Sequence, residues 1–209
     1  MATKKAEEAK GIVIPAIKVE QAKIRIVGDS PLIVHAWSDK AKKMMLDKQT
    51  KAARAGREVR DPWQEYCDSL YWLTEKPEKP KQKDIDKATF GFPATAIKAA
   101  SIDAAYQMGA IEKKTTLRAA FHINAEMIPI IGKPSMREDM VRLGGITSPA
   151  DLRYRGEFKE WAMEFIVQYA PLAVSLEQIV NAINLGGYGC GIGEWRPAKD
   201  GANGRYHVE

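Results

Sequence analysis

The chain has 209 residues, of which 45% are hydrophobic and 28% are charged, a composition that excludes global disorder and fits one domain carrying an insertion. A beginning rich in lysine and glutamate, and the lack of any apolar run of about 18 residues, predict neither a signal peptide nor a membrane anchor. The net charge of +5 favours polyanionic partners, and two cysteines without an export signal predict a cytoplasmic protein with no disulfide framework.

The first half of the chain predicts one strand followed by helices, from apolar residues that recur first at every second position and then at helical spacing. The expected elements are a flexible tail over 1–20, a half-buried strand over 22–27 with a short continuation at 32–34, a basic helix from Ser38 toward Gly56, a helix from Asp61 to Leu73, and a flexible loop over 75–87.

The second half predicts mostly strands, placed between two helices. The expected elements are a small-residue helix over 94–108 stopped by Gly109, strands over 117–123, 127–131, 140–143 and 161–169, a helix over 175–185 begun by the capping box of Ser175 and Gln178, and an edge strand over 205–208.

This order of elements predicts an α+β fold, in which helices cover one face of an antiparallel sheet of the ferredoxin-like or RRM-like kind. We expect residues 21–209 to form a single domain. A helical subdomain is expected as an insertion at about 38–88, and a glycine-rich loop is expected over 186–204.

The glycine-rich loop is the strongest candidate for a binding site. Glycines such as Gly189, Gly191 and Gly193 let backbone amides approach a phosphate closely. Nearby charge and flat aromatic faces suited to nucleic acid come from Arg196, Lys199, Arg205, Tyr188, Trp195 and Tyr206. The structural alternative is a turn that only lets a helix cross a strand.

A second basic region lies between residues 38 and 60, where eight lysines and arginines face three acids. Lys40, Lys42 and Lys43 are its candidates for phosphate contacts. A solvated helix face is the alternative interpretation of the same pattern.

The three histidines, His35, His122 and His207, show no spacing typical of metal ligands, so we expect no metal and no other cofactor. His35 and His207 are conceivable acid–base groups. The weak catalytic candidates are His35 and Asp39, neither of which has a partner visible in the sequence.

Three segments together resemble the RAMP superfamily, the RRM-like backbone subunits of CRISPR effector complexes. They are KIRIVGDSPLIVH at 23–35, FPATAIKAASIDAA at 92–105 and GGYGCGIGEWRPAKDGANGRYHV at 186–208. They are similar to the family's opening strand and turn, its small-residue helix and its C-terminal glycine loop. The GIGEWRP ending also resembles uncharacterised phage-encoded proteins.

The resemblance implies that Lys98, Arg196, Lys199 and Arg205 touch phosphates, and that copies stack head-to-tail along a strand. It therefore favours a non-catalytic protein that binds single-stranded RNA or DNA and forms a homo-oligomer or filament on it, in the host cytoplasm if it is phage-encoded. The alternatives are a metal-independent endoribonuclease, and a phage protein-interaction or inhibitor module with the same fold.

Overall fold

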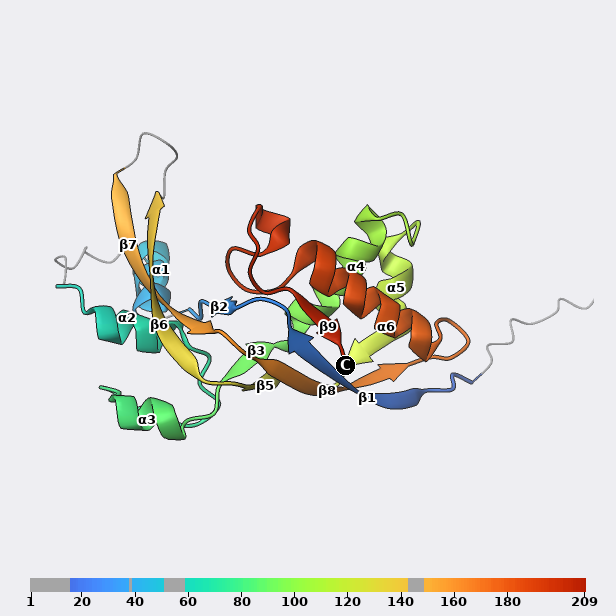
Figure 1. The fold of residues 1–209 in the computed structure, drawn as a ribbon, viewed down its shortest axis with the longest axis horizontal. Helices are drawn as coiled ribbons and strands as arrows, with labels where there is room; N and C mark the ends of the chain where they lie inside the picture. Colours follow the sequence, from blue (N-terminus) through green and yellow to red (C-terminus); the bar gives the residue numbers. More distant parts are fainter. Residues whose placement is uncertain (1–15, 38, 51–58, 143–148) are drawn as a thin grey trace, which may run out of the picture.

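The computed structural model describes residues 16–37, 39–50, 59–142 and 149–209, and within the first helix it describes side chains from residue 42 onward. None of the described helices is both long enough and apolar enough to cross a membrane. Figure 1 shows two parts, a sheet covered by helices on one face and a smaller sheet with helices beside it.

The larger sheet is antiparallel and runs in the order β3-β5-β8-β1-β9, with β4 also paired to β8. Its strands are β1 (Glu20–Gly28), β3 (Gly91–Pro93), β4 (Phe121–Ile123), β5 (Met127–Ile131), β8 (Ala162–Tyr169) and β9 (Tyr206–Val208). The longest pairing joins β1 to β8, where Ile24 lies opposite Phe165 and both side chains are buried. The apolar residues at every second position of these strands are therefore the ones whose side chains face the helices.

Three helices lie on one face of this sheet: α4 (Ala94–Gln107), α5 (Lys114–Ala120) and α6 (Leu176–Leu185) (Figure 1). The capping box predicted for α6 is present, since Ser175 accepts a bond from the backbone of Gln178 and the Gln178 side chain accepts one in return. Apart from the short and inserted elements, the chain runs β1, α4, β5, β8, α6 and β9, which is the βαββαβ order of a ferredoxin-like fold. The predicted ferredoxin-like α+β fold is confirmed.

The smaller sheet has the order β2-β7-β6, with β2 (Leu32–Val34), β6 (Pro134–Arg142) and β7 (Ala150–Phe158). Beside it lie the inserted helices α1 (Asp39–Thr50), α2 (Pro62–Ser69) and α3 (Gln82–Lys87). Helix α2 packs on β7, where the Ser69 hydroxyl accepts a bond from the Gly156 amide. This part of the molecule is thus assembled from two insertions far apart in the sequence.

Four charged side chains are packed together on one face of the β6–β7 hairpin. Arg137 contacts Asp139 at 2.8 Å and Glu157 at 2.7 Å, and Arg155 lies 3.3 Å from Asp139. Asp139, Arg155 and Glu157 are all buried. Burial is tolerable here because each charge faces an opposite one.

The structure corrects several sequence expectations. The segment 75–87, expected to be a flexible loop, contains α3, which buries Ile85. The strand expected over 117–123 is a strand only from Phe121, because its first residues belong to α5. The strand expected at 140–143 begins at Pro134 and is described to Arg142. The part of the first helix expected beyond Thr50 lies outside the described residues.

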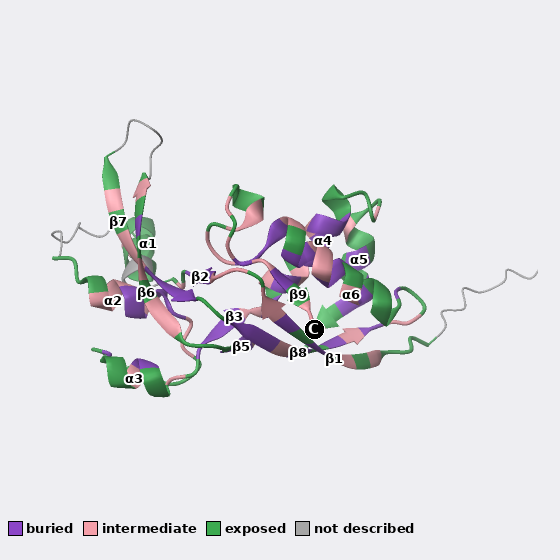
Figure 2. Cartoon of the chain, in the orientation of Figure 1, coloured by how far each residue is buried: buried purple, intermediate pink, exposed green. Residues whose placement is uncertain are grey.

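The core lies between the larger sheet and its helices and continues under the smaller sheet, as the purple regions of Figure 2 show. Ile26, Phe121, Met163 and Ile183 are among its fully buried side chains. Both cysteines are free and buried, and burial raises the pKa of the Cys67 thiol to about 11. The cysteines therefore act as packing residues.

Helix α6 continues into one turn of π-helix, η1 (Gly186–Cys190), which packs against α4 and β9. A Cβ atom on Gly187 would lie 1.9 Å from the Tyr206 carbonyl oxygen, a backbone atom that cannot move aside. A Cβ atom on Gly189 would meet only the terminal methyl of Met108, at 2.5 Å. The first glycine is therefore required for close packing and the second is not.

We expect Gly187→Ala to lower the free energy of unfolding by about 1–3 kcal/mol, because overpacking must push β9 away from η1. Gly189→Ala is the matched control and should change stability by less than about 1 kcal/mol, since the Met108 side chain can rotate. Urea unfolding of both variants measures the difference. Equal losses in the two variants would contradict the packing argument.

Candidate functional site

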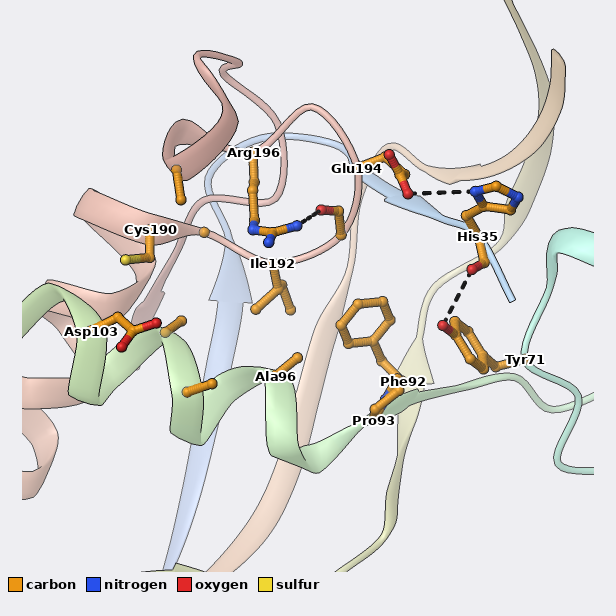
Figure 3. Close-up of a pocket in the computed structure, with 15 residues that line it drawn as sticks. His35, Tyr71, Phe92, Pro93, Ala96, Asp103, Cys190, Ile192, Glu194 and Arg196 are labelled. Atoms are coloured by element: carbon orange, nitrogen blue, oxygen red, sulfur yellow. Dashed lines mark hydrogen bonds and ion pairs between the residues drawn. The ribbon is translucent and has the colours of Figure 1, made fainter. Parts of the chain in front are cut away.

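A cleft of about 290 Å³ lies between the first half of α4 and the loop that follows η1 (Figure 3). From α4, the small side chains of Ala96, Ala99 and Ala100 and the carboxylate of Asp103 line it. The other lining residues come from the end of β2, the segment after α2, β3, η1 and the loop: His35, Tyr71, Phe92, Pro93, Cys190, Gly191, Ile192, Gly193, Glu194, Arg196 and Ala198.

The loop after η1 is anchored on the connection between β1 and β2. The Glu194 amide donates to the Ile33 carbonyl at 2.9 Å, the Gly204 amide to the Pro31 carbonyl at 2.8 Å, and the Arg205 amide to the Ser30 hydroxyl at 3.0 Å. These amides point into the protein. These three amides are therefore used to anchor the loop, while Gly191 and Gly193, two of the glycines predicted to approach a phosphate, line the cleft.

Trp195 sits at the exposed turn of this loop with φ of 53°, a left-handed conformation that a bulky residue rarely adopts. Its carbonyl accepts a bond from the Asn203 amide at 3.0 Å, and a Cβ atom on Gly201 would lie 1.8 Å from the same oxygen. The side chain remains 40% exposed. The loop thus holds an indole at the surface at a cost in backbone strain.

The other two aromatic candidates of the loop differ in exposure. Tyr188, on η1, is 71% exposed, so its ring is open to solvent. Tyr206 is 1% exposed and packs edge-on to Trp161, with ring centroids 6.2 Å apart. The expectation that Tyr206 offers a face to a base is therefore wrong.

The three predicted cations of the loop lie at different depths. Arg196 is half-buried, lines the cleft and donates from Nη1 to the Gly193 carbonyl at 2.8 Å. Lys199 is exposed on the short helix η2 (Pro197–Lys199). Arg205 is half-buried, and its Nε has no hydrogen-bond partner among the described residues. Arg196 is the one of the three that lines the cleft.

Lys98 lies on α4 but does not line the cleft. Its Nζ is 3.2 Å from His122 Nδ1 and 5.5 Å from the centroid of the Phe121 ring. Burial lowers the pKa of Lys98, and the nearby charge of Arg118 lowers it further. The structure therefore places this lysine beside β4, apart from the glycine loop.

The basic candidates of the inserted helix lie in the other part of the molecule. Lys42 and Lys43 are exposed on α1. The side chains of Asp39 and Lys40 lie outside the described residues, although the backbone of both belongs to α1. The structure thus divides the predicted basic residues between the glycine loop and α1.

The cleft contains a histidine–carboxylate pair that the sequence did not reveal. His35 Nδ1 lies 3.4 Å from Glu194 Oε1, and the Tyr71 hydroxyl donates to the His35 carbonyl at 3.3 Å (Figure 3). The contact with His35 lowers the pKa of Glu194; partial burial opposes this, and the charges of Arg155 and Arg196 add to the lowering. The weak catalytic candidate His35 therefore has a partner.

The open face of the larger sheet offers little for nucleic acid. All five aromatic side chains of its described strands are buried: Phe92, Phe121, Phe165, Tyr169 and Tyr206. The exposed cations of β1, Lys23 and Arg25, are both paired with Glu164. Stacking surfaces and unneutralised charge lie instead on the glycine-loop side.

Metal-binding groups are likewise sparse. Among the described residues there is no cluster of three or more histidine, cysteine, aspartate or glutamate side chains that could hold a metal ion. A second histidine–carboxylate contact, between His207 Nδ1 and Asp29 Oδ1 at 2.6 Å, joins β9 to the residue that follows β1.

No protein-family model matches this sequence, and no curated protein matches it. In structure, the chain is similar to Cmr6 from Pyrococcus furiosus, whose crystal structure aligns with 93% of this chain and 100% of that chain, with a TM-score of 0.46 and 9% identity. A similarity of this degree transfers no activity and no residue role to this chain.

We expect His35→Ala to raise the pKa of Glu194, because it removes the largest cause of the lowering. Carbon-13 NMR of the glutamate carboxyl groups measures this directly. Because the pKa of Glu194 is lower in the folded state, its ionised carboxylate stabilises the protein at pH values above its ordinary pKa near 4.5. This contribution to stability is lost as the pH falls through the folded-state pKa. His122→Ala is the control, and an unchanged Glu194 pKa in His35→Ala would contradict the pairing.

Proposed function

We propose that this protein binds single-stranded nucleic acid, RNA or DNA, without catalysis, at the cleft between α4 and the glycine loop. The observation that carries the proposal is Trp195, an exposed indole held in a strained conformation between Glu194 and Arg196, which line the cleft, and four residues before Lys199. Aromatic faces next to cations are the usual means by which proteins bind single strands without reading sequence.

The three segments that resemble the RAMP superfamily support this proposal, because all three contribute to one place. His35 ends the first segment, Phe92 and Pro93 begin the second, and 190–198 belongs to the third, and residues from each line the cleft. Segments far apart in sequence thus meet at a single surface. This convergence favours membership of that superfamily and a binding role for the cleft.

A base stacked on Trp195 would gain about 1–3 kcal/mol, and the adjoining phosphates would lie near Lys199 and Arg196. Contacts of this kind hold the strand without distinguishing bases. On the open face of the larger sheet, Lys23 is paired with a carboxylate and no aromatic side chain of the described strands is exposed. The nucleic-acid strand is therefore expected on the helix side of the molecule. We further propose that copies line up along one strand in the host cytoplasm, with a phage as the source of the chain.

The His35–Glu194 pair favours one second candidate function, that of a metal-independent endoribonuclease. A histidine oriented by a carboxylate in a cleft can move a proton to or from a reacting hydroxyl. Cleavage of a bound RNA, lost in His35→Ala while binding persists, would support this candidate. If the RNA stays intact after long incubation, the endoribonuclease candidate is excluded and only the binding role remains.

We expect Trp195→Ala to weaken binding of single-stranded RNA or DNA about tenfold or more, whatever the sequence, because a stacking face is removed. Lys199→Glu should weaken binding. It should also make the dependence of log affinity on log salt concentration shallower, by about one unit for each phosphate that the variant no longer neutralises. Fluorescence anisotropy across a salt series measures both. Tyr106→Ala and Lys159→Glu, exposed residues away from the cleft, are the controls.

An absence of binding to RNA, single-stranded DNA and duplex at low salt would overturn the proposal. It would favour the remaining alternative, a protein-interaction or inhibitor module built on the same fold. Light scattering on the same mixtures tests the oligomer, since the mass must grow with the length of the strand if copies assemble on it.

A further inference from the structure

A second and larger hollow, of about 880 Å³, lies between α1, α2 and β7. We name it the α1 groove. Its apolar wall consists of Trp37, Met44, Met45 and Val59, which are between 46% and 94% exposed. Large apolar side chains gathered at an accessible hollow are typical of a surface that takes a ligand.

The charged groups of the α1 groove are already paired, but one of them also carries a donor atom without an acceptor among the described residues. Arg60 contacts Glu65 and Asp151, and Arg153 contacts Asp151. The remaining carboxylates are also used: Asp68 pairs with Lys76, and Asp61 accepts bonds from two amides at the start of α2.

The group with this additional donor is Arg155. It lines the α1 groove and is 8% exposed, and its Nη1 lies 3.3 Å from Asp139. Its Nε is buried without a hydrogen-bond partner among the described residues. A buried donor without an acceptor is costly, so each such group calls for an explanation. A phosphate oxygen is the acceptor that a guanidinium fits best.

The α1 groove adjoins the cleft of the glycine loop. His35 lines both hollows, and Trp37 follows it by two residues. Figure 3 shows His35 at the edge of the cleft, on the side away from α4. A single-stranded nucleic acid that leaves the glycine loop past His35 therefore meets Trp37 next.

We propose that a single strand bound at Trp195 continues past His35 into the α1 groove, where one base packs against Trp37 and Met45 and a neighbouring phosphate accepts a bond from Arg155. This inference rests on the proposed function and extends it by a second contact region. Proteins that bind single strands in extended grooves cover about 4–16 nucleotides. An RNA of about 16 nucleotides is therefore expected to reach both the glycine loop and the α1 groove.

The test compares single-stranded RNA of about 4 and about 16 nucleotides, binding to the full chain and to three variants. Trp37→Ala removes the stacking face, Arg155→Lys keeps the positive charge beside Asp139 but removes Nε, and Trp195→Ala removes the first contact. Leu172→Ala, which changes an exposed leucine that lines neither hollow, is the control. Thermal unfolding of each variant checks that the fold is kept.

We expect Trp37→Ala and Arg155→Lys to weaken binding of the long RNA about tenfold and to leave the short RNA unchanged, whereas Trp195→Ala weakens both. Long RNA carrying 5-bromouridine should form photo-crosslinks to the peptide that contains Trp37. Wild-type affinity of both groove variants for the long RNA, with crosslinks confined to the glycine loop, would overturn the α1 groove as part of the path while the proposed function stands. If neither RNA binds the wild type, both proposals fall together.

Discussion

The connection from Gly28 to Ile33 is the constraint on which the rest of the structure depends. It links β1 of the larger sheet to β2 of the smaller one, and the Trp161 indole fixes it by donating to the Ser30 carbonyl at 2.8 Å. The glycine loop is bonded to the same few residues. The position of the loop, and hence the width of the cleft, is therefore set by where the two sheets meet.

Local signals predicted most of the larger sheet and its helices. The alternation over 161–169 and the capping box at Ser175 depend only on neighbouring residues, so the sequence alone was enough. Helix α3 was missed because one buried residue, Ile85, holds a segment that is otherwise lysine- and proline-rich. Apart from the strand expected at 140–143, the β6–β7 pair was not predicted, because its buried face is charged and charged residues are taken as exposed until their partners on the next strand are known.

In the candidate site too, the features that depend on neighbouring residues were predicted and those that depend on distant residues were not. Arg196 and Lys199 are close in sequence and fall at one loop, as predicted, whereas Lys98 was assigned by resemblance and lies beside β4. The partnership of His35 with Glu194 joins opposite ends of the chain, and no local pattern signals it. Trp195 was predicted as a stacking residue, but its left-handed backbone was not, because the strain there arises from contacts that only the folded loop makes.

The charged face of the β6–β7 hairpin also limits how this protein can diverge. Arg137 and Arg155 share Asp139, and Glu157 pairs with Arg137, so loss of Asp139 leaves Arg155 without its acidic partner and loss of Arg137 leaves Glu157 without its basic one. A viable change at one position therefore requires a compensating change on the other strand. Across related sequences, these four positions should vary as a set, with the sign of one predicting the sign of the next.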